Sequence, residues 1–215
     1  MPVWLHLDRK IYKNCPYWVC PLDDDIEKVF DPKRNHLFEG GEAVRWIALD
    51  ESGEAVGRIA AFYDKTHAFG YEQPTGGCGF FESIDNREVA FALFDAAREW
   101  LSENGMEAMD GPINFGSRDQ WWGLLINGFE HQPLYGNPYN MPYYQQMFEE
   151  LARQHSGDKQ VAPAQRVSDF VYGRESRSLP KTSYIPGLTP SRLDKWMPEV
   201  IGERLRSGIA TFGRR

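Results

Sequence analysis

At 215 residues the chain is long enough for one substantial domain, and 24 basic against 31 acidic side chains give a net charge of -7. Because a protein that grips phosphate backbones needs a basic face, and no Lys/Arg cluster supplies one, the sequence argues against nucleic acid as a main partner. No apolar run approaches the roughly 20 residues of a membrane span, and Met1–Leu7 lacks the basic lead of a signal peptide, so we expect a soluble cytoplasmic protein without a membrane partner.

The N-terminal part predicts two helices followed by a β-hairpin. Residues 4–13 have the pattern of a short helix, and Leu22–Phe30 predicts a second one whose three leading aspartates sit where the helix dipole favours anions. Ala43–Asp50 and Ala55–Asp64 are rich in β-formers, and Gly53 in the short polar connector between them is a hairpin signal.

The clearest local pattern is a strand, Cys78–Ile84, followed by a long helix, Asn86–Asn104. Asp85 and Glu88 have the spacing of a capping box, and Gly105 stands where a left-handed C-terminal residue is wanted. One face of the helix is apolar at helical spacing, formed by Val89, Leu93, Ala97, Trp100 and Leu101.

The segments around this unit are less regular. We interpret His67 to Gly77 as a mobile polar stretch and Ala108–Gly111 as a further strand. Ser117 is a candidate cap for a helix that would end at Asn127-Gly128, and Pro142 would open a helix reaching about Arg153.

The C-terminal part gives weaker signals. Val167–Tyr172 alternates like a strand, and Ser191–Arg206 has the pattern of a helix among prolines and glycines. We therefore predict one domain over residues 1–173 and a peripheral or poorly ordered tail over residues 174–215. The sequence leaves open whether the chain forms a homodimer.

Several segments together resemble an uncharacterised bacterial branch of the acyl-CoA N-acyltransferase (GNAT) superfamily. They lie between about Ile11 and Glu149 and read KNCPYWVCPLDDDIEKVFDPKRN, VGRIAAF, GFFESIDNREVAFALFDAAREWL, GPINF, GLLINGF and NPYNMPYY. The resemblance implies a GNAT-like fold, that is, an α/β fold (α+β) built around a mixed sheet. Members of that branch begin upstream of this N-terminus, so the first GNAT strand is either missing here or supplied differently.

The resemblance also implies a site for acyl-CoA or acetyl-CoA as co-substrate. This site would be a V-shaped gap where Cys78–Ile84 and Ala108–Gly111, as parallel strands, splay apart. Pantetheine would pair with the edge of the first strand, and the pyrophosphate would sit on the N-terminus of the following helix. The candidate cofactor-binding residues are Phe81, Ser83, Ile84, Arg87, Asn114 and Ser117.

The sequence departs from the family at the phosphate turn. A typical GNAT carries R/Q-x-x-G-x-G/A there, whereas this chain reads Glu82-Ser83-Ile84-Asp85-Asn86-Arg87 without a glycine. Asp85 would occupy the cap itself and repel a pyrophosphate, and Arg87 would compensate only in part. The alternative is a plainly capped helix. Asn114 and Ser117 likewise have the alternative of a turn and a cap.

Three residues are candidates for catalysis. Glu82, beside two phenylalanines, would have a pKa raised by desolvation, which suits a general base. The resemblance implies a tyrosine as general acid, either Tyr143 or Tyr144. The alternatives are a salt-bridged or solvent-facing glutamate and an ordinary packed loop of tyrosines.

Two hypotheses of function follow, with a third that places a different ligand in the same gap. The first is an N-acyltransferase acting on an amine of a small molecule or peptide, without a metal, since neither the three cysteines nor the five histidines show metal-ligand spacing. The second is a non-catalytic binding or assembly module on a degenerate GNAT fold, with Trp121 or Trp122 as a contact.

Overall fold

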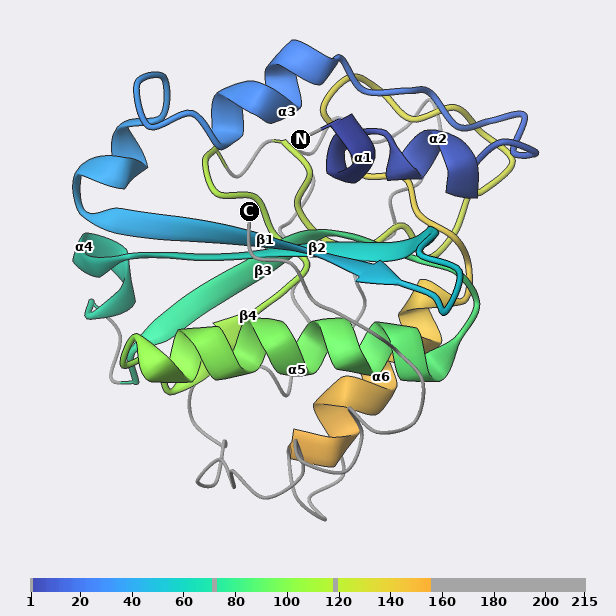
Figure 1. Ribbon diagram of the computed structural model, residues 1–215. Coiled ribbons are helices and arrows are strands. Elements are labelled where there is room, and N and C mark those ends of the chain that lie inside the picture. The colour runs from blue at the N-terminus through green and yellow to red at the C-terminus, as the bar shows by residue number, and fades with distance from the viewer. Residues whose placement is uncertain (1, 71–72, 118–119, 156–215) are drawn as a thin grey trace.

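The computed structural model describes residues 2–70, 73–117 and 120–155, which form an α+β structure around a four-stranded mixed sheet. The strands lie in the order β1-β2-β3-β4; the first two pairings are antiparallel and the third is parallel. The N-terminal helices cover one face of this sheet and α5 and α6 cover the other (Figure 1). Within the described ranges, none of the helices has the length and apolarity needed to cross a bilayer.

The predicted N-terminal helices and hairpin are confirmed. The first helix is broken at His6 into α1 (Pro2–Leu5) and α2 (Leu7–Ile11), and α3 (Asp23–Val29) begins with the three aspartates. The hairpin strands are β1 (Gly41–Leu49) and β2 (Ala55–Asp64), with Gly53 at φ 82 in the turn. Two short elements that the sequence pattern did not indicate flank the hairpin: η1 (His36–Glu39) and α4 (Lys65–Ala68).

The strand β3 (Thr75–Ser83) begins earlier than predicted, so the interpretation of His67 to Gly77 as mobile and polar was wrong at its end. The start of this strand was not predicted because Gly76 and Gly77 have low β-propensity. Both are needed for close packing, because a Cβ on Gly76 would come 2.4 Å from Leu101 Cδ2, and one on Gly77 would come 2.5 Å from Phe62.

The parallel partner of β3 is β4 (Ala108–Asp110), as predicted, but the two strands pair only over Thr75–Gly77. Beyond this point the chain after β4 crosses next to β3, where Ile113 N–H donates to Cys78 O at 2.8 Å. Next to this crossing, the register between β2 and β3 shifts, and Phe80 in the bulge has φ 51. The last residues of β3 are therefore not paired with β4.

The long helix α5 (Arg87–Glu103) is confirmed, and its apolar face packs on the sheet. Its predicted cap was wrong by one residue. Asn86, not Asp85, is the N-cap, and its side chain accepts from the backbone N–H groups of Glu88 and Val89. Asp85 is exposed. Asparagine caps as well as aspartate, and here the extended backbone at Asn86 decides which of the two does so.

The last described helix is α6 (Tyr144–His155), which starts two residues after Pro142. The helix predicted from Ser117 to Asn127 was wrong over the part that the structure describes: residues 120–127 are irregular. Trp121 and Gly123 have φ of 47 and 88, values that an α-helix does not tolerate, and Trp121 N–H donates to Gly136 O instead.

The remaining sequence predictions concern residues 156–215, which lie outside the described residues. These are the strand at Val167–Tyr172, the helix at Ser191–Arg206, and the division into residues 1–173 and 174–215. They stay predictions.

Candidate active site

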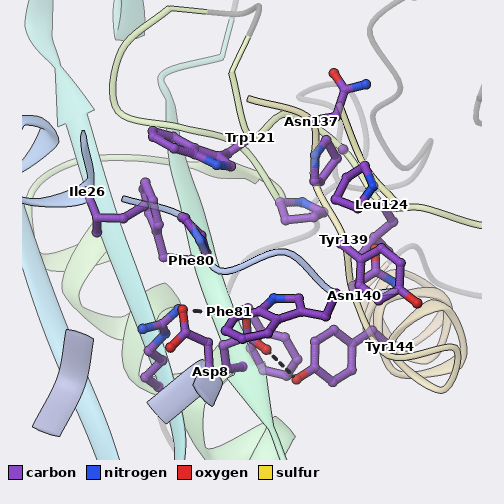
Figure 2. A pocket seen from close by; sticks show the side chains of 18 of the residues that line it. Asp8, Ile26, Phe80, Phe81, Trp121, Leu124, Asn137, Tyr139, Asn140 and Tyr144 are labelled. Carbon is purple, nitrogen blue, oxygen red and sulfur yellow. Dashed lines mark hydrogen bonds and ion pairs between the residues drawn. The ribbon is translucent and has the colours of Figure 1, made fainter. Parts of the chain in front are cut away.

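A pocket opens where the end of β3, the segment after α2 and the irregular segment before α6 meet. Its cavity volume is about 100 Å³, and the empty space together with the open solvent at its mouth is about 730 Å³. In Figure 2, Ile26, Phe80 and Trp121 lie on one side, and Tyr139, Asn140 and Tyr144 lie on the other. Most of the lining is apolar or aromatic, and it also includes Trp18, Val19, Phe81, Leu124 and Phe148. Three charged side chains join this lining: Asp8, Arg58 and Glu82.

Glu82 is the candidate base, and it is buried to 8% exposure. Burial raises the pKa of its carboxyl to about 7, and nearby Asp8 acts in the same direction. The positive charge of Arg58 and hydrogen bonds from Tyr144 and Tyr12 act in the opposite direction and keep that pKa from rising further. A carboxyl with this pKa is half ionised near neutral pH, as a general base should be.

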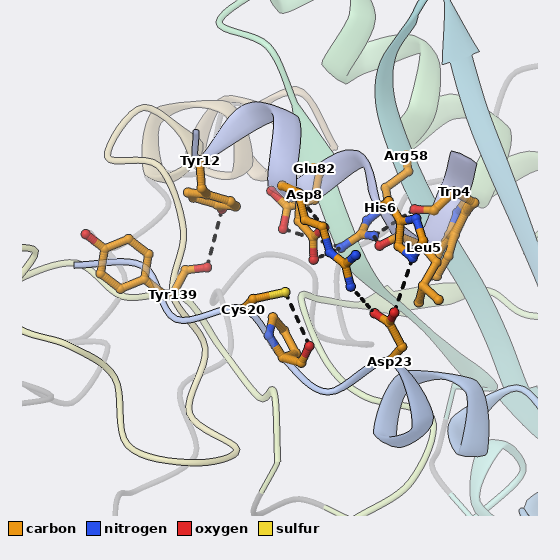
Figure 3. Close-up of polar contacts among 12 residues, drawn as sticks. Trp4, Leu5, His6, Asp8, Tyr12, Cys20, Asp23, Arg58, Glu82 and Tyr139 are labelled. Atoms are coloured by element: carbon orange, nitrogen blue, oxygen red, sulfur yellow. Dashed lines mark hydrogen bonds and ion pairs between the residues drawn. The ribbon is translucent and has the colours of Figure 1, made fainter. Parts of the chain in front are cut away.

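Arg58 and Asp8 complete the charged floor (Figure 3). One nitrogen of the Arg58 guanidinium, Nη1, donates to the carbonyls of Trp4 and Leu5 at 2.7 and 2.8 Å. The other, Nη2, faces two carboxylates, with Asp8 Oδ2 at 3.4 Å and Glu82 Oε1 at 3.7 Å. The guanidinium also lies 4.8 Å from the ring centroid of Trp4. These contacts fix Arg58 between the N-terminal helices and β3.

The two tyrosines proposed as acids contact the end of β3, Tyr144 from the first position of α6 and Tyr143 from the residue before it. Tyr144 donates to Glu82 Oε2 at 2.8 Å, and its oxygen accepts from the Ser83 backbone N–H at 2.8 Å. Tyr143 donates to Ser83 O at 2.7 Å. Burial raises the pKa of Tyr143 to about 12 and raises the pKa of Tyr144 well above its ordinary value, so both remain protonated donors at neutral pH.

The residues predicted to bind the pantetheine arm lie at the end of β3, and their edge is already occupied. Phe81 lines the pocket and stacks on Phe94 at 4.7 Å between ring centroids. Ser83 is fully buried, and both its backbone N–H and its carbonyl bond to tyrosine hydroxyls. Ile84 is exposed to 36%. A pantetheine amide could pair at Ser83 only by replacing those hydroxyls.

The helix end predicted to hold the pyrophosphate is occupied as well. Asn86 satisfies two of the N–H groups that a phosphate would use. Arg87 pairs with Glu150 of α6, with Nη2 to Oε1 at 2.6 Å, and its guanidinium lies 4.2 Å from the centroid of the Phe91 ring. This helix end is therefore tied to α6 and presents no glycine cradle.

Asn114 and Ser117 do not join the other predicted residues. Asn114 is buried, Ser117 is exposed, and neither lines the pocket. The Asn114 amide lies 3.5 Å from Ser117 O, which matches the predicted alternative of a turn.

Backbone strain gathers at the pocket. Within the described residues, the non-glycine residues with positive φ are Phe80 and Trp121, and their rings lie 5.8 Å apart in the lining. Bulky aromatic residues rarely take this conformation, and strain of this kind clusters at functional sites.

Sequence reasoning missed Asp8, Tyr12, Trp18 and Arg58. Arg58 had a usable signal, since it is the one charge within the otherwise apolar run VGRIAAF. Tyr12 and Trp18 stack at 5.1 Å between centroids, across a turn that no periodic pattern marks. Asp8 reads as an ordinary first-turn helix residue, and only its packing on β2 shows otherwise.

Comparisons with known proteins give two curated relatives and one family model. The chain is 31% identical over 184 residues to Protein YghO of Escherichia coli (strain K12), which covers 83% of this chain and 45% of that protein. It is 28% identical over 200 residues to the bacterial ceramide synthase of Caulobacter vibrioides (strain NA1000 / CB15N), which covers 89% of this chain and 50% of that protein. A family model described as FAD-dependent protein, C-terminal domain-like, matches residues 118–215. No solved structure matches.

The chain is thus homologous to both relatives and spans about half of their length. Both alignments are too long to fit within residues 118–215, so they include part of the first 117 residues, whereas the family model does not reach the residues before 118.

Proposed function

We propose that the chain is part of a GNAT-like N-acyltransferase that moves an acyl group from acyl-CoA to the amine of a small molecule with an apolar chain. The observation that carries this proposal is Glu82, a buried carboxyl with a pKa of about 7 at the floor of an aromatic pocket. Homology to a ceramide synthase supports it, because a ceramide is a long-chain amine acylated on nitrogen.

The apolar lining favours a substrate with an aliphatic chain over a peptide. Burying the methylene groups of such a chain against this lining lowers the free energy, because apolar surface leaves water. The apolar lining includes Trp18, Val19, Ile26, Leu124 and Phe148. A peptide backbone would instead need several hydrogen-bond partners. The charged groups of the lining lie together around Arg58, where a single head group would reach them, while Asn137, Tyr139 and Asn140 add polar atoms elsewhere.

In the proposed reaction, the substrate binds as its ammonium ion, Glu82 accepts a proton from it, and the resulting neutral amine attacks the carbonyl carbon of the thioester. The C–N bond forms, the C–S bond breaks, and the thiolate leaves. The thiolate takes its proton from Tyr143 or Tyr144, whose hydroxyl is restored by the proton that the new amide nitrogen gives up. Tyr144 already donates to Glu82 at 2.8 Å, so base and acid are adjacent.

The described residues suit the acyl acceptor better than the nucleotide of the donor. Asn86 fills the end of α5 and Glu150 holds Arg87, so we place no CoA phosphate there. Isothermal titration of the full chain with acetyl-CoA and with longer acyl-CoAs, together with release of free thiol in the presence of a long-chain amine, tests the donor. Binding and thiol release are expected with a long acyl chain. Absence of heat and of a thermal shift at millimolar acyl-CoA would overturn the catalytic proposal.

The same filled helix end favours a second candidate, a non-catalytic binding module that keeps the pocket and has lost the phosphate grip. It predicts that the pocket binds a ligand while no thiol is released, and that Glu82→Gln leaves the biological role intact. Substitution of Trp121, which lines the pocket, would impair that role. The thiol-release assay separates the two candidates.

A further inference from the structure

The floor of the pocket holds three charged side chains that are almost removed from water. Asp8, Arg58 and Glu82 are 5%, 4% and 8% exposed. With both carboxylates ionised, one guanidinium faces two negative charges, which leaves the floor with one negative charge in excess. Excess buried charge is costly unless a partner neutralises it.

Arg58 cannot serve both carboxylates well, because its position is fixed elsewhere. Its Nη1 is held by two backbone carbonyls, and its Nη2 reaches the carboxylates at 3.4 and 3.7 Å. Charge-assisted hydrogen bonds of this type are normally about 2.7–2.9 Å long. The polar floor is therefore incompletely satisfied by the protein's own groups.

Among the residues that the structure describes, the other groups around the floor add no positive charge. Tyr12 and Tyr144 contribute neutral hydroxyls, since burial raises the pKa of both. Arg9 follows Asp8 in the chain, but its guanidinium turns outward to Asp23, at 2.6 Å. Apart from a proton on Glu82, a positive charge that neutralises this floor would come from a ligand.

We propose that Asp8 and Glu82 together bind the substrate amine as its ammonium ion, with Asp8 as the anchor and Glu82 as the proton acceptor. This inference rests on the proposed function and names the substrate-binding residue of the same site. A proton moves from the ammonium nitrogen to a Glu82 oxygen, which leaves a neutral amine and a neutral carboxylic acid. Asp8 stays beside Arg58, with Oδ2 3.4 Å from Nη2, so the head group stays held while its nitrogen becomes a nucleophile.

The proposal fits the shape of the site. The carboxylates lie at the floor, whereas Trp18, Val19, Pro21 and Pro133 lie elsewhere in the lining, so a primary amine at the end of an aliphatic chain satisfies both parts. A fatty alcohol would leave the excess negative charge in place. A fatty carboxylate would increase it.

The experiment measures binding without any acyl donor, so its failure is distinct from failure of acyl transfer. The full chain is titrated calorimetrically with octylamine, 1-octanol and octanoate at about pH 8, where Glu82 is ionised and an alkylamine is still protonated. Octylamine is expected to bind at least about tenfold more tightly than the other two. Equal binding of 1-octanol or octanoate would overturn the proposal, and this comparison uses only the unmodified protein.

Asp8→Asn then tests the anchor. It should reduce octylamine affinity at least about tenfold and remove the preference over 1-octanol. Glu51→Gln, an exposed acid in the hairpin connector, is the matched control and should leave the preference intact. A circular dichroism melt establishes that Asp8→Asn is folded before titration. If the folded variant keeps the full preference for octylamine, Asp8 is not the anchor.

Discussion

The two halves of β3 have different neighbours. The first half, around Gly76 and Gly77, lies between β2 and β4 and is held on both edges by backbone hydrogen bonds. The second half, Phe80 to Ser83, keeps β2 on one edge but contacts the side chains of Tyr143 and Tyr144, at the start of α6, on the other. The first half builds the framework, and the second exchanges a regular neighbour for side chains that surround a buried acid. One strand thus provides both rigidity and chemistry.

The largest expected effect comes from Glu82→Gln, in the second half. Loss of a general base typically lowers the rate by about 10²–10⁴, so acyl transfer should fall by that factor. Unmodified enzyme should gain activity as the pH rises through about 7, because Glu82 must lose its proton to act. Initial rates of thiol release, measured from about pH 5.5 to about pH 9 so that the range spans the titration of Glu82, check both expectations. Glu88→Gln, an exposed acid on α5, is the control.

Glu82→Gln should also change how the free energy of unfolding depends on pH. The pKa of Glu82 rises from 4.5 in a free carboxyl to about 7 in the fold, so the folded protein holds that proton more tightly than the unfolded chain. This contribution is fully present below about 4.5 and is lost as the pH rises through about 7, at a cost of order 3 kcal/mol. Urea unfolding at several pH values should show the loss in the unmodified protein and not in Glu82→Gln. Identical pH profiles would mean that Glu82 does not titrate in this way.

In the first half of β3, we expect the substitution Gly79→Ala, at the end of that half, to be the most destabilising. A Cβ at this position would lie 1.8 Å from the carbonyl oxygen of Ile113, which is backbone and cannot swing aside. We expect a loss of about 3 kcal/mol in the free energy of unfolding, at the upper end for overpacking. Gly53→Ala gives a comparison, since nothing lies within 4 Å there and only its φ of 82 is strained. It should cost about 1 kcal/mol in the same urea titration.

Tyr144→Phe and Tyr143→Phe separate the two hydroxyls at the edge of the second half. Without the Tyr144 hydroxyl, the buried Ser83 N–H loses its acceptor, which should cost about 1–3 kcal/mol of stability. Loss of its hydrogen bond to Glu82 should also raise the pKa of Glu82 and move the pH–rate midpoint upward. Tyr143→Phe should cost less, because the hydrogen bond from Tyr143 to Ser83 O is only partly buried. A midpoint unchanged in Tyr144→Phe would contradict the assigned contact.

The comparison also explains what the sequence could predict. The strand–helix unit and the hairpin follow from local patterns, such as the apolar stripe of α5 and Gly53 in its turn, whereas the parallel pairing with β4 was predicted from the family resemblance. The beginning of β3 could not be read, because Gly76 and Gly77 have low β-propensity and owe their place to packing against Leu101 and Phe62.

The site was predictable only in part, for a related reason. Glu82, Tyr143 and Tyr144 were chosen by resemblance, and the structure brings them together although they are about 60 positions apart. Their charged neighbours Asp8 and Arg58 are 50 positions apart, and no spacing rule joins them. Long-range contacts of this kind depend on how the N-terminal helices pack on the sheet, which local sequence does not encode.

The smallest expected effect concerns the junction that follows the second half of β3. Asn86 accepts from two backbone N–H groups at the start of α5, so Asn86→Ala should cost about 1 kcal/mol in the free energy of unfolding. Asp85→Ala should change it by less than about 0.5 kcal/mol, since Asp85 is exposed and does not cap the helix. Matched urea titrations of the two variants make the comparison. A larger loss in Asp85→Ala than in Asn86→Ala would mean that Asp85 is the N-cap. Its carboxylate would then lie at the N-terminus of α5, where it would repel a phosphate.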